Sequence, residues 1–167
     1  MALTLVLGGA RSGKSALAER MVKRMPMPTT YIAPAVVDPD DADFLARIEL
    51  HRARRPGAWR TIECGTDIGG ALTSSVGTAL VDSLGTWVAA YGGEDPDVPA
   101  LLAALAARTG DTVLVSDEVG FGVHPATEVG RRFREQLGDV NVAVAAVADQ
   151  VLLVVAGRVL SLEASPW

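Results

Sequence analysis

Short runs of apolar, β-prone residues recur along the chain and alternate with stretches whose apolar residues return every three or four positions. Most of the short runs are apolar throughout, which is the pattern of parallel strands buried on both faces. Their alternation with helices predicts an α/β fold, a mostly parallel sheet flanked by helices. The predicted strands cover residues 3–7, 29–33, 77–81, 112–116, 151–155 and 158–162.

The last two predicted strands are separated only by Ala156-Gly157, a spacing that predicts a tight hairpin at the C-terminal edge of the sheet. The helices expected from apolar positions at helical spacing are longer segments, and Asp97 is a candidate cap for the fifth of them. They cover residues 14–25, 40–54, 66–74, 84–91, 98–108, 126–137 and 140–148.

One motif stands between the first predicted strand and the first predicted helix: Gly8-Gly9-Ala10-Arg11-Ser12-Gly13-Lys14-Ser15. It fits the phosphate-binding loop of P-loop NTPases, in which backbone N–H groups and a helix N-terminus surround the phosphates. In that role Lys14 reaches the β- and γ-phosphates and the Ser15 hydroxyl binds Mg²⁺. The alternative is a chance glycine turn before a helix, which does not explain why a strand precedes it.

Carboxylates follow two other predicted strands, at the edge where open parallel sheets bind their ligands. Asp82 is a candidate second group on the metal side of a P-loop site. The alternative is a helix cap, since Asp82 or Ser83 precedes a predicted helix. Asp117 and Glu118 are candidates to polarise a hydroxyl or water, or to hold the metal shell. Their alternative role is hydrogen bonding to loop amides.

A basic segment around Arg47, His51 and Arg55 is the second unusual feature. On a helix, His51 lies between the two arginines. Cationic neighbours lower the pKa of a histidine and favour the neutral, nucleophilic imidazole, and they also hold a triphosphate. The alternatives are a histidine at the edge of an apolar face and a solvated basic stripe. The other histidine, His124, lies in a turn and receives no role.

Composition limits the class of protein. The chain has 167 residues, of which 49% are hydrophobic, and residues 1–167 are expected to form a single P-loop nucleotide-binding domain. The net charge of −5 argues against a nucleic-acid partner recognised by phosphate neutralisation. No uninterrupted apolar run has the roughly 20 residues of a membrane span. Cys64 is the only cysteine, so no intramolecular disulfide forms and a cytoplasmic location is expected.

Three groups of residues occur together and in order: the phosphate loop, a histidine segment and a glycine-rich motif after the fourth predicted strand. With them, the chain closely resembles the bifunctional adenosylcobinamide kinase / adenosylcobinamide-phosphate guanylyltransferase family of cobalamin biosynthesis. The last two groups are Arg47-Ile48…His51-Arg52…Arg55-Pro56…Trp59 and Glu118-Val119-Gly120…Gly122-Val123…Pro125.

The resemblance implies a RecA-like P-loop NTPase fold and a homo-oligomer, a trimer in that family. It implies that ATP or GTP phosphorylates adenosylcobinamide, and that GTP then donates GMP, through an enzyme histidine, to make adenosylcobinamide-GDP. By the motif match that histidine is His51, with Lys14 as the other catalytic group and Mg²⁺ held at Ser15 and Asp82. Further nucleotide contacts implied by similarity are Ala33-Pro34-Ala35, Arg52-Ala53-Arg54-Arg55, Glu63 and Asp82.

The chain departs from the family pattern at Ser116-Asp117, often Thr-Asn, and at Val142, often Gln after the asparagine. Asp82 is often glutamate, and His124 replaces a commoner aliphatic residue. Two other functions compete with the bifunctional enzyme. One is a single-activity small-molecule kinase of the same fold, with His51 only a phosphate ligand. The other is a nucleotide-binding regulatory protein without catalysis. The absence of an Asn-Lys-x-Asp guanine motif argues against this second alternative.

Overall fold

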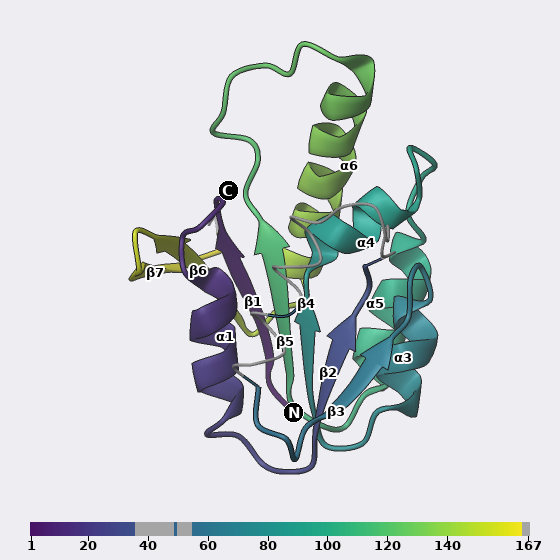
Figure 1. Cartoon of the computed structure of the whole chain (residues 1–167), viewed down its shortest axis with the longest axis vertical. Helices are drawn as coiled ribbons and strands as arrows, with labels where there is room; N and C mark the ends of the chain where they lie inside the picture. Colours follow the sequence, from purple (N-terminus) through teal and green to yellow (C-terminus); the bar gives the residue numbers. More distant parts are fainter. Residues whose placement is uncertain (36–48, 50–54, 165–167) are drawn as a thin grey trace.

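The computed structural model describes residues 1–35, 49 and 55–164. A seven-stranded sheet forms its centre, in the order β3-β2-β4-β5-β1-β6-β7 (Figure 1). The first six strands in this order run parallel, and only β7 is antiparallel. The strands are β1 (Leu3–Gly8), β2 (Thr29–Ala33), β3 (Arg60–Glu63), β4 (Thr78–Asp82), β5 (Thr112–Asp117), β6 (Gln150–Val155) and β7 (Arg158–Leu162).

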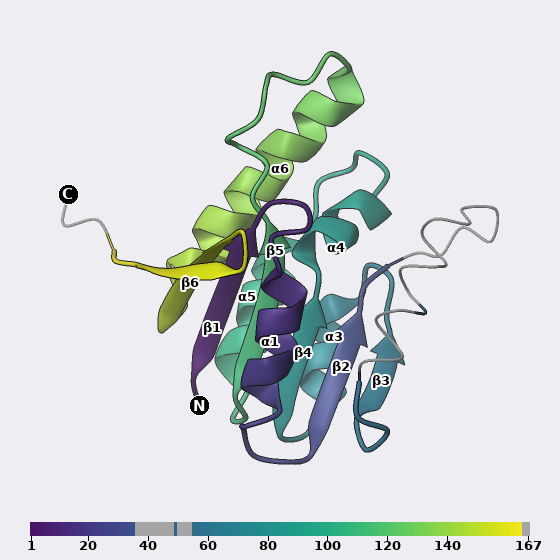
Figure 2. The same ribbon diagram turned by 60° about the vertical axis from the view of Figure 1, so that its left-hand side comes forward.

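Helices cover both faces of the sheet, as the continuously apolar strands require. α1 (Lys14–Val22) packs on one face, and the other helices whose bounds lie within the described residues are behind the sheet (Figure 2). These are α3 (Ile68–Ser74), α4 (Leu84–Ala90), α5 (Val98–Ala107) and α6 (Glu128–Ala145). In β1, Leu5 faces the larger core under α3 to α6, while the next residue, Val6, faces the core under α1.

The helix starts follow their capping residues. Asp97 accepts a hydrogen bond from Ala100 N at 3.0 Å and caps α5, as predicted. Ser83 caps α4 in a reciprocal capping box with Thr86. α3 begins at Ile68, two residues later than predicted, because Asp67 is its cap and accepts from Gly70 N at 2.8 Å.

The two helices predicted over residues 126–137 and 140–148 are one helix, α6, which corrects the sequence prediction. The two predicted ranges leave out the glycine and aspartate at positions 138 and 139, yet a glycine inside a helix costs only about 1 kcal/mol. The buried residues Leu137, Val140 and Val144 continue one apolar stripe across that point and offset the cost. α1 also ends earlier than predicted, at Val22.

The C-terminal hairpin is confirmed. β6 and β7 pair antiparallel from Val151 with Leu162 to Val155 with Arg158, around a turn in which Ala156 and Gly157 both have positive φ. The predicted helix over residues 40–54 lies outside the described residues except at residue 49. Among the helices that the structure describes, none is long and apolar enough to cross a bilayer.

Candidate functional site

The phosphate loop connects the end of β1 to the start of α1. Gly13, the N-cap of α1, has φ 97°, a left-handed conformation in which an L side chain is strained. Gly8 also has to be glycine, since a Cβ there would lie 2.7 Å from the carbonyl oxygen of Val154. The hairpin braces the loop from outside, because Gly157 N donates to Ser12 O at 2.9 Å. The loop is therefore fixed by backbone geometry that its sequence specifies.

Lys14, the lysine of the loop, points toward the carboxyl end of β5. Its Nζ lies 2.6 Å from Oδ1 of Asp117 and also donates to the carbonyl oxygen of Gly9 at 3.3 Å. The lysine side chain is 12% exposed, against 30% for the aspartate. β5 is the immediate neighbour of β1, so the sheet order itself places this carboxylate beside the loop.

Ser15 and Asp82 lie together on the other side of the lysine. The Ser15 hydroxyl donates to Oδ1 of Asp82 at 3.2 Å. Asp82 ends β4, which is separated from β1 by β5 alone, so the carboxylate comes from the next strand but one. The helix-cap alternative for Asp82 is wrong, because Ser83 caps α4. Two hard oxygen donors thus stand side by side, the chemistry that Mg²⁺ prefers.

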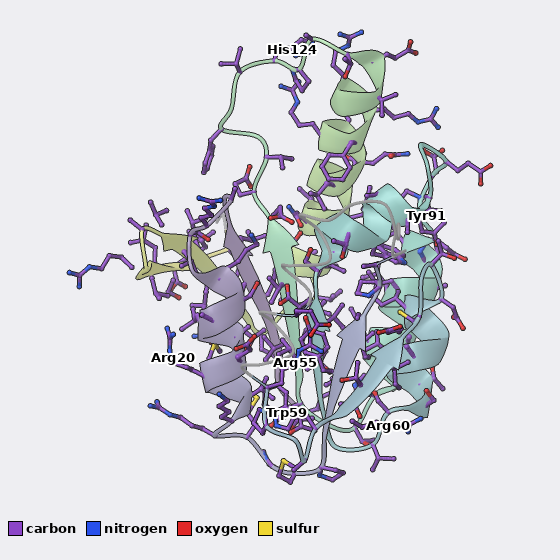
Figure 3. All side chains as sticks on the ribbon, viewed as in Figure 1. Arg20, Arg55, Trp59, Arg60, Tyr91 and His124 are labelled. Carbon is purple, nitrogen blue, oxygen red and sulfur yellow. The ribbon has the colours of Figure 1, made fainter. Side chains whose placement is uncertain are left out.

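A buried tyrosine completes this cluster. Tyr31, in β2, donates its hydroxyl to Oδ2 of Asp82 at 3.2 Å. The guanidinium carbon of Arg55 lies 3.4 Å from the centre of the tyrosine ring, and Figure 3 shows Arg55 between α1 and β2 in that view. Burial, and then the charge of Asp82, hold the pKa of Tyr31 well above its usual value, so the hydroxyl stays a proton donor.

The model of the family described as cobinamide kinase / cobinamide phosphate guanyltransferase matches residues 4–162. The chain belongs to this family. A Pseudomonas aeruginosa relative named bifunctional adenosylcobalamin biosynthesis protein CobP is 38% identical over 97% of this chain and 98% of its own. A Salmonella typhimurium relative named CobU is 36% identical over 93% of this chain and 96% of its own.

The fold is also shared with a solved ATPase of a bacterial type III secretion system. That structure superposes with a TM-score of 0.56 at 11% identity, over 91% of this chain and 50% of the ATPase. This family member therefore has the RecA-like P-loop fold that its resemblance implied.

The two carboxylates at the end of β5, Asp117 and Glu118, have different partners in this family member. Asp117 pairs with Lys14 and accepts from the Ser83 hydroxyl at 3.4 Å, so it belongs to the phosphate-loop cluster. Glu118 instead accepts from Gly120 N at 2.6 Å, which is the loop-amide alternative. The loop-amide hydrogen bond is therefore seen for Glu118, whereas the partners of Asp117 are Lys14 and Ser83.

Sequence reasoning gave no role to Tyr31 or to Asn141. Asn141, which is 8% exposed on α6, accepts from the Ser116 hydroxyl at 2.6 Å and donates to the carbonyl oxygen of Asp117 at 3.1 Å. It fixes the strand end that carries the carboxylate. The available signal was that Asn141 is the only asparagine, within an otherwise apolar helix stripe.

The remaining predicted residues either lie along the carboxyl ends of the parallel strands or fall outside the described residues. Ala33 pairs with Glu63 at the ends of β2 and β3, and Pro34 and Ala35 follow. Three strands stand between β3 and β1, so Glu63 is the most distant of these predicted contacts in the sheet order. His51 and residues 52–54 lie outside the described residues. His124 is exposed, and its Nδ1 lies 2.9 Å from a guanidinium nitrogen of Arg134.

Proposed function

We propose that this protein phosphorylates adenosylcobinamide with ATP or GTP and then transfers GMP from GTP to adenosylcobinamide phosphate through a guanylylated His51, giving adenosylcobinamide-GDP. The observation that carries the proposal is the hydrogen bond between Ser15 and Asp82 beside Lys14, in a chain of the cobinamide kinase / guanyltransferase family. Its relatives are named bifunctional adenosylcobalamin biosynthesis proteins, which fits two activities in one chain.

In the kinase step, the loop amides and the N-terminus of α1 bind the phosphates. Lys14 exchanges its contact with Asp117 for the β- and γ-phosphate oxygens and spreads their charge. The Ser15 and Asp82 oxygens fit Mg²⁺, which takes one or two carboxylates together with substrate phosphates, and which would neutralise charge on the transferred group. The phosphorus–oxygen bond to the corrinoid hydroxyl forms as the bond to the nucleoside diphosphate breaks.

In the transferase step, the neutral imidazole of His51 attacks the α-phosphorus of GTP and pyrophosphate leaves. The phosphate of adenosylcobinamide phosphate then attacks the phosphoramidate, and the histidine is released. Residues 52–55 supply the cations near it in sequence, and Ala33-Pro34-Ala35 and Glu63 are further proposed nucleotide contacts. Sequence resemblance supports these assignments.

We also propose a homo-oligomer, a trimer as in the family. Support comes from the C-terminal hairpin, where β7 is exposed along its length and four large apolar side chains reach solvent in the isolated chain: Val155, Val159, Leu160 and Leu162. The lone cysteine favours a reducing cytoplasmic location, and residues 1–167 are proposed to form one nucleotide-binding domain.

The test is covalent labelling. The protein is incubated with α-labelled GTP and Mg²⁺ and denatured, and acid-labile, alkali-stable label is measured on the chain. Label is expected on the wild type and on His124→Ala, the matched control at the other histidine, and none on His51→Ala. Undiminished label on His51→Ala excludes His51 as the attachment site. No label on the wild type, with ATP-dependent phosphorylation of the corrinoid intact, selects the single-activity kinase.

A further inference from the structure

We propose that Tyr31 is the positioning residue of the nucleotide site: its hydroxyl orients the metal-side carboxylate of Asp82, and its ring face holds the guanidinium of Arg55 in place. This inference rests on the proposed function only in taking Asp82 and Arg55 as groups that serve a bound Mg²⁺-nucleotide. It assigns a role to a residue that belongs neither to the phosphate loop nor to the histidine segment.

The first half of the inference concerns the carboxylate. Asp82 receives two hydroxyl hydrogen bonds on different oxygens, from Ser15 on Oδ1 and from Tyr31 on Oδ2, each at 3.2 Å. A carboxylate held at both oxygens has one orientation, and hydrogen bonds to charged groups are the stronger ones. If the Ser15 hydroxyl turned to a bound Mg²⁺, the Tyr31 hydroxyl would still hold Oδ2 of Asp82.

The tyrosine is itself immobile. It is 2% exposed and packs in the core under α1 with Val6, Ala18 and Leu80. This packing fixes the ring, so its hydroxyl is held in the position from which it donates to Asp82.

The second half concerns Arg55. Its guanidinium carbon lies 3.4 Å from the ring centre, a cation–π contact. Its Nε is buried and has no hydrogen-bond acceptor among the described residues. The arginine is thus held partly by a ring face, which uses none of its N–H donors. Arginine side chains lose much rotamer entropy when they bind, and the ring has already imposed that loss.

The experiment separates the hydroxyl from the ring. Binding of a fluorescent GTP analogue is titrated against Mg²⁺ and, separately, in EDTA, for Tyr31→Phe and Tyr31→Leu. Tyr31→Phe keeps the ring, so we expect the Mg²⁺ midpoint to rise about tenfold, with unchanged affinity in EDTA. Tyr31→Leu should in addition weaken binding in EDTA about fivefold, because Arg55 loses its support. The control is Tyr91→Phe, which removes the only other tyrosine hydroxyl, an acceptor for Asp97 N on the far side of the sheet.

The outcomes are distinct. A Mg²⁺ midpoint for Tyr31→Phe within twofold of the wild type overturns the first half. An EDTA effect of Tyr31→Leu that persists in full in an Arg55→Met background overturns the second, because the ring then does not act through the arginine. Thermal melting identifies a misfolded Tyr31→Leu, in which case Tyr31→Phe and Arg55→Met decide. If the wild type binds no Mg²⁺-nucleotide, the proposed function fails; if it binds and labels at His51 while Tyr31→Phe is unaltered, only this inference fails.

Discussion

Lys14 has an anionic partner before any nucleotide arrives, and this has a measurable consequence. Its Nζ contacts Oδ1 of Asp117 at 2.6 Å, where a triphosphate would have to compete with the carboxylate for the same ammonium. The perturbation is Asp117→Asn, which keeps the shape of the side chain and removes its charge. We expect this variant to bind nucleotide more tightly than the wild type when no divalent metal is present.

The magnitude follows from the contact. Two unit charges at that distance attract by about 6 kcal/mol at an effective dielectric constant of about 20. Desolvation of both groups cancels most of this attraction, and hydrogen bonds to charged groups contribute about 1.5–3 kcal/mol net. Because Lys14 keeps its bond to the carbonyl oxygen of Gly9, the lower figure applies. Asp117→Asn should therefore lower the Kd for GTP about tenfold.

The assay is a fluorescence titration with a GTP analogue in EDTA at fixed ionic strength, since salt screens exposed charges. EDTA removes any contribution of Asp117 to a metal shell. The matched control is Asp111→Asn, which removes the same charge at the opposite end of β5, where the carboxylate accepts from Ala2 N at 2.8 Å. Its Kd should stay within twofold of the wild type.

Weaker binding by Asp117→Asn in EDTA would refute the reasoning. It would mean that the carboxylate holds Lys14 in the conformation that the phosphates need, rather than competing with them. An equal gain in affinity for Asp111→Asn would mean that the change in net charge, rather than the loss of the contact with Lys14, causes the tighter binding.

Two further predictions concern the scaffold. Arg108 is 8% exposed and donates to the carbonyl oxygens of Leu72 and Ser75. In Arg108→Met these acceptors stay buried without a donor, so the free energy of unfolding should fall by about 3 kcal/mol. Urea denaturation compares this variant with Arg132→Met, a surface control whose free energy of unfolding should change by less than about 0.5 kcal/mol. If Arg108→Met loses no more stability than this control, Arg108 does not stabilise the scaffold. Burial, and then the charge of Asp67, raise the pKa of Cys64 from 9.0 to about 11. The rate of iodoacetamide alkylation should therefore climb about tenfold per pH unit from pH 8 to 10, because the thiolate is the reactive form. An alkylation rate that levels off near pH 9 would show that the thiol has an unperturbed pKa.

Most of the fold could be predicted because the strands are almost uninterrupted apolar runs and the helices have capping residues. The predicted strand over residues 29–33 has the observed bounds, whereas β3, a run of only four residues, is not among the six predicted strands. The break predicted at positions 138 and 139 is wrong because α6 runs through them. Its apolar stripe is buried against the rest of the protein, and that tertiary packing stabilises the continuous helix.

The phosphate loop was predictable because its residues are consecutive, whereas the groups around it come from separate strands. Lys14 and Asp117 are more than a hundred positions apart, and their contact depends on β1 and β5 being neighbours, which no local pattern specifies. The same holds for Asn141, whose two hydrogen bonds reach from α6 to β5. Residues that act across elements require the sheet order first.

Tyr31 is the clearest case. Within Thr29–Ala33 it is an aromatic residue in a strand, which by itself indicates only core packing. β2 pairs with β4 so that Tyr31 lies beside Leu80, and both face α1. Because side chains alternate between the faces of a sheet, Asp82, two positions after Leu80, faces α1 as well. Once that register is known, the phenol and the carboxylate are diagonal neighbours on the face that carries Ser15, so their meeting follows from strand parity rather than from any sequence motif.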